Sequence, residues 1–137
     1  MLFAVRPDSP VPIYEQITSQ IVFRIAAGDL LPGELVPSVR DLAHRMVVNP
    51  NTVARAYQDL ERLGILEVKR GRGMEVTSNG PQVCDQLRRD IVRGRLRDVL
   101  REAVAGALTI EEVQELVEQE WTKMNGRGKR RAKGAES

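Results

Sequence analysis

Residues 37–73, PSVRDLAHRMVVNPNTVARAYQDLERLGILEVKRGRG, decide the fold of this chain. They predict two helices joined by a tight turn, followed by a hairpin of two strands. The second helix should begin at Pro50, because Asn49 suits the N-cap position and a proline at the first helical position needs no N–H. Gly64 should end this helix in a left-handed conformation. Apolar residues recur between them at spacings of three and four and predict one buried face: Val53, Ala56, Tyr57, Leu60 and Leu63.

The opposite face of this second helix is polar and basic, which suits the major groove of DNA. We expect Asn51, Thr52 and Arg55 to contact base edges there, since asparagine pairs with adenine and arginine with guanine. Asn49 caps the helix, and a phosphate contact by the same side chain stays open. Arg40, in the first turn of the preceding helix, is either a solvated cation or a clamp on phosphate or guanine.

The hairpin is expected to consist of strands over residues 65–69 and 74–77, with the turn at 70–73. Glycines at such a tip allow the backbone to approach a duplex, and an arginine can enter the minor groove. The predicted contacts are Arg70, Arg72 and Gly73. By itself RGRG is a weak signal, because many hairpins have such a turn.

Several motifs in the same order resemble the winged helix-turn-helix of the GntR family of bacterial transcription regulators. They are PIYEQI (12–17), GDLLPGE (28–34), PSVRDLA (37–43), NPNTV (49–53), RAY (55–57), Leu60-Glu61, Gly64 and GRG (71–73). The form of the fourth motif is similar to the small YtrA-like branch. Family members often carry arginine where this chain has Pro50 or Ala54, so those contacts are not carried over.

The bulk properties narrow the class of protein. Net charge is only +2, but residues 38–73 hold seven basic and four acidic side chains, enough for a local phosphate-binding surface. The single cysteine, Cys84, excludes an internal disulfide and favours a cytoplasmic protein, here associated with the nucleoid. No apolar run is long enough to span a bilayer. The single histidine, His44, has no metal-ligand partners and offers little acid–base chemistry, so we expect no metal, no cofactor and no enzyme.

Elsewhere the chain reads as helical. A first helix is expected over 13–27 as scaffold, and residues 1–5 either pack as an N-terminal arm or strand or are disordered. Residues 78–81 read as a boundary, followed by helices over about 82–105 and 110–122, the latter opened by a capping box at Thr109. A row of arginines on the first of these two helices is interpreted as a solvated face.

Two such helices cannot bury both apolar stripes alone, so we expect them to form a twofold dimer. The residues expected at its interface are Leu87, Ile91, Leu96, Val99, Leu100, Val113, Leu116, Val117 and Trp121. YtrA-like regulators resemble this arrangement of a winged domain with a short helical tail. A small-molecule effector stays open, because the sequence identifies no pocket for one.

The expected fold is mainly α with a small β-wing: a winged helix-turn-helix DNA-binding domain (1–78), a two-helix dimerisation region (79–122) and a basic disordered tail (123–137). The expected function is a homodimeric transcription regulator, acting as a repressor. It would bind double-stranded DNA at an inverted-repeat operator, through residues 50–63 in the major groove and 70–73 in the minor groove. The alternative is a protein-interaction module that uses the same fold without binding DNA.

Overall fold

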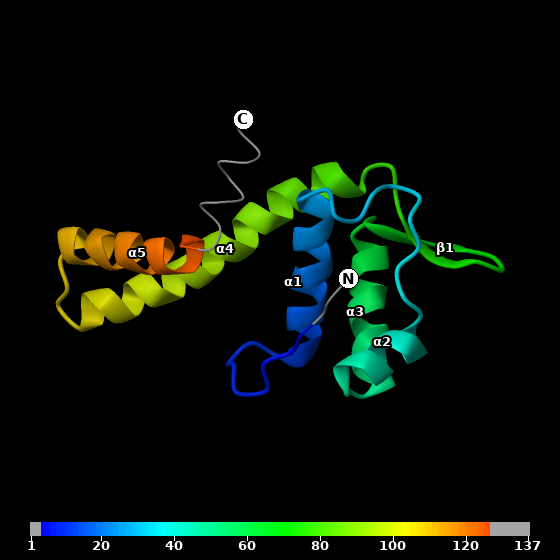
Figure 1. Cartoon of the computed structure of the whole chain (residues 1–137), viewed down its shortest axis with the longest axis horizontal. Coiled ribbons are helices and arrows are strands. Elements are labelled where there is room, and N and C mark those ends of the chain that lie inside the picture. Colours follow the sequence, from blue (N-terminus) through cyan, green and yellow to red (C-terminus); the bar gives the residue numbers. More distant parts are fainter. Residues whose placement is uncertain (1–3, 127–137) are drawn as a thin grey trace. The chain divides into compact units, whose positions relative to one another are not determined.

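A computed structural model describes residues 4–126 of the chain. These residues form five helices and two strands (Figure 1). In chain order they are α1 (Ile13–Ala26), α2 (Val39–Met46), α3 (Pro50–Arg62), β1 (Leu66–Lys69), β2 (Gly73–Val76), α4 (Gly80–Ala105) and α5 (Ile110–Asn125). The chain divides into two compact units within α4, between Arg93 and Gly94. The expected mainly α fold with a small β-wing is confirmed.

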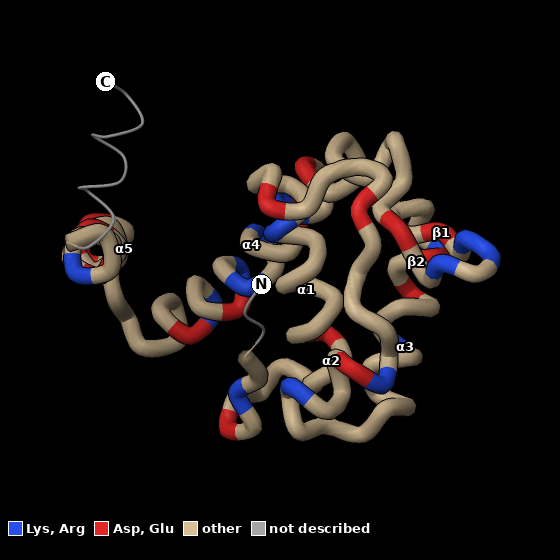
Figure 2. Tube along the Cα trace, turned by 45° about the vertical axis from the view of Figure 1, so that its right-hand side comes forward, with Lys and Arg blue, Asp and Glu red and all other residues tan. Residues whose placement is uncertain are grey.

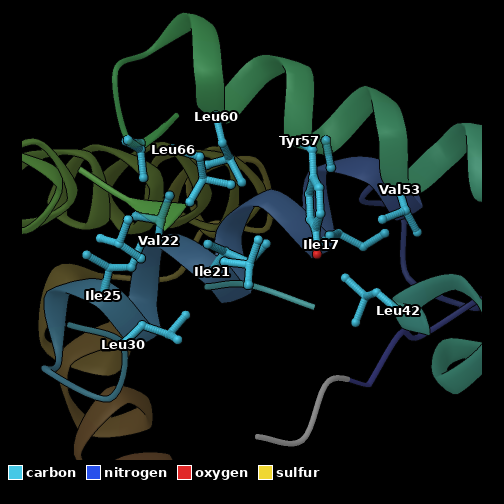
Figure 3. Packing of buried hydrophobic residues seen from close by; sticks show 14 of the residues in the cluster. Ile17, Ile21, Val22, Ile25, Leu30, Leu42, Val53, Tyr57, Leu60 and Leu66 are labelled. Atoms are coloured by element: carbon cyan, nitrogen blue, oxygen red, sulfur yellow. The ribbon is translucent and has the colours of Figure 1, made fainter. Parts of the chain in front are cut away.

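The core of the first unit lies where α1, α2 and α3 meet (Figure 3). The side chains that α1 contributes repeat every four residues, as the sequence predicted, and Ile17, Ile21 and Ile25 are all fully buried. Facing them are Leu42 from α2 and Val53 from α3, among other aliphatic side chains. Such burial of isoleucine and leucine contributes roughly 1.5–3 kcal/mol per side chain, and it fixes α3 against a rigid support.

Capping interactions set the helix boundaries near the predicted residues. The Ser38 hydroxyl accepts a hydrogen bond from the Asp41 backbone N–H at 3.1 Å, and the Asn49 side chain accepts one from the Asn51 N–H at 2.8 Å. Gly64 follows α3 with φ +78°, as expected for a helix-ending glycine. Helix α3 therefore begins at Pro50 because both its cap and its first residue favour that start.

The two strands form an antiparallel hairpin in which Leu66 pairs with Val76 and Lys69 with Gly73. We call residues 66–76 the wing. A third segment, which the sequence did not predict, supports it: the Val36 N–H donates to the Met74 carbonyl, and the Val76 N–H donates to the Glu34 carbonyl, both at 2.9 Å. These bonds satisfy the backbone of β2 on its second edge and tie the wing to the segment that leads into α2.

Helix α4 starts at Gly80, two residues earlier than expected, and its first turns belong to the first unit. Gly80 and Cys84 are buried, and a Cβ at Gly80 would lie 3.0 Å from Val76 Cγ1. A larger residue at this position would therefore require Val76 to shift by a few tenths of an ångström, so glycine favours the close approach of α4 to the wing. The first compact unit thus continues beyond residue 78, where the domain boundary was expected.

In the second unit, the end of α4 and all of α5 are joined by a short turn. Thr109 and Glu112 form the predicted capping box, with both reciprocal hydrogen bonds present. Helix α5 runs to Asn125, so residues 123–125, expected in the tail, are helical instead. The rest of that tail, from 127, and residues 1–3 lie outside the described residues. Within residues 4–126, the helices are too short or too polar to cross a membrane.

The N-terminal lead is packed from Ala4 onward. The backbone of Ala4 exchanges hydrogen bonds with the Gln20 side chain, and that of Arg6 with the Gln16 side chain. Val5 packs against the core. Among the alternatives for residues 1–5, the packed arm describes residues 4 and 5.

Candidate nucleic-acid interface

The N-terminus of α3 is exposed and carries short polar side chains. Asn49 and Asn51 are exposed, and Thr52 is half-buried in the first turn. The first N–H groups of a helix carry partial positive charge, so this end attracts phosphate oxygens. The Asn51 N–H donates to Asn49 Oδ1 in the cap. Within the described residues, the Asn49 amide nitrogen and the side-chain amide of Asn51 remain available to a ligand.

Arg40 lies beside this helix end. It is exposed, and no hydrogen bond or ion pair within residues 4–126 engages its guanidinium. An open surface hollow brings it together with the turn between the two helices; its lining residues are Arg40, Ala43, His44, Val47, Val48, Asn49 and Pro50. A free cation next to a helix N-terminus can hold one phosphate from two sides. His44, read as a surface residue, is exposed on the rim of this hollow.

Arg55 has a partner that the sequence did not predict. Its guanidinium carbon lies 3.7 Å from the centroid of the Tyr14 ring, so the side chain stacks on the start of α1. Asn51 and Arg55 are one helical turn apart and share a face of α3. A base contact by Arg55 must therefore be made from the Tyr14 ring or after leaving it, at a cost on the order of 0.5–1 kcal/mol for such a stack at an exposed site.

The two arginines predicted at the wing tip differ in whether they have an ion-pair partner. Arg70 is exposed and has no partner within the described residues. Arg72 Nη1 lies 3.6 Å from Glu75 Oε2, and Lys69 Nζ lies 3.2 Å from Glu67 Oε1. Gly73 has φ +120°, and this backbone conformation suits only glycine. The acidic partners lie on the strands rather than in the turn, so the turn motif by itself did not predict them.

Tyr57, predicted to be a core residue, is buried, and its hydroxyl donates a hydrogen bond to the Pro37 carbonyl at 2.6 Å. Burial raises the pKa of Tyr57 well above the usual range for a phenol, so the hydroxyl stays a donor. The bond joins α3 to the segment that leads into α2. It therefore fixes the angle at which α3 and Arg40 are presented together.

The expected dimerisation residues separate into two groups. Leu87 and Ile91 pack against the core of the first unit, so they are used within the chain itself. The others belong to the second unit, where Leu96, Val99, Leu116, Val117 and Trp121 are exposed and Leu100 and Val113 half-buried. An open apolar groove runs between α4 and α5 in this unit, and Leu116 and Trp121 are among its lining residues.

Three arginines of the row on α4, which was interpreted as a solvated face, pair with aspartates one turn away: Arg89, Arg93 and Arg101. The fourth, Arg97, has no such partner within residues 4–126. Arg89 contacts Asp85, and Arg93 contacts Asp90 at 3.4 Å. Exposed pairs of this kind contribute little to stability, about 0.3–0.5 kcal/mol each. They partly neutralise the arginines, which agrees with a solvated rather than a DNA-contacting face.

Comparison with known proteins gives one consistent result. Residues 13–76 match the family model "Bacterial regulatory proteins, gntR family". The chain is 34% identical over 118 residues to the HTH-type transcriptional repressor YtrA of Bacillus subtilis (strain 168), covering 86% of this chain and 91% of the relative. The structure resembles a GntR family transcriptional regulator from Listeria monocytogenes with a TM-score of 0.69 and 32% identity, covering 82% of this chain and 97% of that one.

A further solved structure with a similar fold contains DNA. The DNA-binding domain of AraR in complex with the operator ORX1 matches with a TM-score of 0.50 and 28% identity, over 54% of this chain and 94% of that chain. The relatives are regulators rather than enzymes, which confirms the expectation of a non-enzymatic protein. With its capped recognition helix, its wing and its near-complete coverage of the B. subtilis relative, this chain belongs to the GntR family of transcription regulators, in the YtrA-like branch.

Proposed function

We propose that the protein is a homodimeric repressor that binds an inverted-repeat operator, with α3 in the major groove and residues 70–73 in the minor groove. The observation that carries this proposal is that Arg40, which has no partner among residues 4–126, lies next to the exposed N-terminus of α3. Helix-turn-helix proteins read base edges with the first residues of the second helix. A protein acting in this way would work on nucleoid DNA in the cytoplasm.

Each side chain then has a distinct role. Arg40 and Asn49 are assigned to phosphate, because they line the hollow next to the helix end. Asn51 is assigned to a base edge, since its amide can pair with adenine in the major groove. Thr52 lies farther round the helix. Arg55 shares the face of Asn51, but the stack on Tyr14 limits where its guanidinium can reach.

The dimer is supported by the apolar groove of the second unit. A soluble chain that exposes Trp121 at 67% and Leu116 at 49% beside one another gains by covering them. A second copy of the same two helices offers a complementary apolar surface and places two winged units on one DNA molecule. Their recognition helices would then meet half-sites about one turn, roughly 34 Å, or a multiple of it apart.

Selection of bound sequences from a random DNA pool, followed by fluorescence-anisotropy titration of the selected duplex, tests the proposal. We expect an inverted repeat and affinity that falls steeply with salt. Asn51→Ala should lose about 1–3 kcal/mol on the selected sequence and relax the preference at one base pair. Arg40→Ala should weaken binding to all sequences and lower the salt slope by about one.

Arg101→Ala provides the matched control, because this arginine pairs with Asp98 on α4 and is not among the residues assigned to DNA. It should leave both affinity and slope close to those of the parent protein. Enrichment of no sequence, together with no salt-dependent binding, would refute the proposal and favour the protein-interaction module.

A further inference from the structure

Strand β2 buries a carboxylate close to the wing tip that is proposed to contact DNA. Glu75 is only 9% exposed, and its partner across the hairpin is another acid, Glu67. Like charges at directly opposed positions destabilise a hairpin. In addition, Glu75 Oε2 accepts no hydrogen bond from any of the described residues. Buried carboxylates are normally hydrogen-bonded, so an acid kept here calls for a reason other than the stability of the hairpin.

Two cations of the wing lie within ion-pair distance of this acid. Arg72 Nη1 is 3.6 Å from Glu75 Oε2, and Lys69 Nζ is 3.9 Å from a Glu75 carboxylate oxygen. Lys69 also lies 3.2 Å from Glu67. We call these four residues, Glu67, Lys69, Arg72 and Glu75, the wing charge cluster. Its formal charge is zero, and Figure 2 shows the acidic positions of the two strands next to the basic hairpin tip.

The geometry distinguishes two roles for Glu75. A carboxylate that fixes an arginine for DNA contact holds it by short, paired hydrogen bonds. Here Arg72 is 62% exposed, and its contact with Glu75 is longer than a hydrogen bond, so the pair is electrostatic and can be exchanged. A phosphate oxygen arriving at the wing competes with Glu75 for the same guanidinium. Arg70, two residues earlier, has no such competitor within residues 4–126.

We infer that Glu75 is a positioning residue that withholds Arg72, and together with Glu67 also Lys69, from random DNA and so raises the selectivity of the protein for its operator. The inference rests on the proposed function. Nonspecific affinity comes from cations that neutralise phosphates, and a cation already paired within the protein contributes less to it. At the operator, base contacts by α3 also hold the wing against the DNA. A phosphate oxygen can then replace Glu75 as the partner of Arg72.

Substitutions of the two tip arginines test this without disturbing the core. Binding of a random-sequence duplex is measured by anisotropy at several salt concentrations for Arg70→Gln and Arg72→Gln. We expect Arg70→Gln to weaken binding by about three- to tenfold, as for the loss of one phosphate contact, and Arg72→Gln by less than about twofold. Equal losses would overturn the inference, because Arg72 would then already be available to phosphate.

Glu75→Gln gives the complementary measurement, since it keeps the shape of the side chain and removes its charge. Affinity for the random duplex should rise about three- to tenfold, with a steeper salt slope, while affinity for the selected operator rises less. In an Arg72→Gln background the same substitution should have a clearly smaller effect, because one of its two partners is gone. Unchanged or weaker binding of random DNA by a folded Glu75→Gln protein would refute the inference.

Glu67→Gln is the matched control, because this glutamate is exposed and contacts only Lys69 within the cluster. It removes the same charge and should change random-DNA affinity less than Glu75→Gln does. Thermal melting verifies that each variant is folded. A parent protein that shows no salt-dependent DNA binding would refute the proposed function itself, whereas salt-dependent binding with equal arginine losses would refute only the role of Glu75.

Discussion

At the scale of single residues, Val47 combines a side chain and a backbone conformation that oppose each other. It ends α2 with φ 54° and ψ 53°, a left-handed conformation that costs an L-residue roughly 1–2 kcal/mol. Its side chain is 88% exposed, so packing returns little of that cost. Val47→Gly should therefore stabilise the protein by about 0.5–1 kcal/mol, after allowing for the greater chain entropy of glycine in the unfolded state.

Chemical denaturation measures this change, and Ala107→Gly is its matched control. Ala107 also has a positive φ, 61°, but alanine is less strained there than a β-branched residue. The gain at residue 107 should be smaller. A loss of stability in Val47→Gly would contradict this prediction, because it would mean that the valine side chain stabilises the folded protein although it is exposed.

Cys84 is the second residue with a testable property. It is fully buried at the start of α4, and burial raises the pKa of its thiol from 9.0 to about 11. Because the thiolate is the reactive form, the folded protein at pH 8 should react with a thiol reagent far more slowly than the unfolded chain.

The same shift makes Cys84 contribute to the pH dependence of stability. The unfolded chain loses its thiol proton near pH 9 while the folded chain keeps it, so this contribution is intact below about pH 9 and is lost between about pH 9 and 11. Denaturation at several pH values, compared with Cys84→Ala, isolates it from other groups. Rapid labelling of the folded protein at pH 8 would contradict the burial.

At the scale of elements, the second unit depends strongly on how its last helix begins. Thr109 accepts a hydrogen bond from the Glu112 N–H at 3.1 Å, and the Glu112 carboxylate accepts one from the Thr109 N–H at 3.0 Å. Helix α5 has no fully buried residue, so packing within the chain offers it little other support. Thr109→Ala should cost about 1 kcal/mol of helix stability.

Native-state hydrogen exchange of the α5 amides measures that loss of helix stability residue by residue. Thr122→Ala, near the other end of the same helix and also exposed, serves as the control and should leave protection unchanged or slightly raised, because alanine favours a helix more than threonine does. Equal loss of protection in both variants would show that composition, rather than the cap, determines the stability of α5.

At the scale of the whole molecule, the exposed groove of the second unit predicts association. Leu116 lines it, whereas Val104 on α4 is exposed outside it. Leu116→Glu should place a charge in the proposed interface and convert the dimer to a monomer, and Val104→Glu should not. Sedimentation velocity distinguishes the two states. A parent protein that sediments as a monomer at micromolar concentration, or a dimer insensitive to Leu116→Glu, would contradict this interface.

The regular parts of the first unit were predictable because local chemistry fixes them. Asn49-Pro50 set the start of α3, Ser38 capped α2, and the spacing of Ile17, Ile21 and Ile25 gave the buried face of α1. Which arginines of the candidate site are free to contact DNA was less predictable. The stack of Arg55 on Tyr14 joins residues 41 positions apart, and no local pattern reports such a contact.

The sequence by itself determined the order of the elements, the caps that bound them, the family and the short polar residues at the start of α3. These depend on interactions between residues only a few positions apart. Only the tertiary structure decided which arginines are free, that α4 completes the first unit, and that a buried Glu75 opposes Glu67 beneath the wing tip. The physical reason is that pairing and burial of charge depend on distances between segments, and these exist only once the chain has folded.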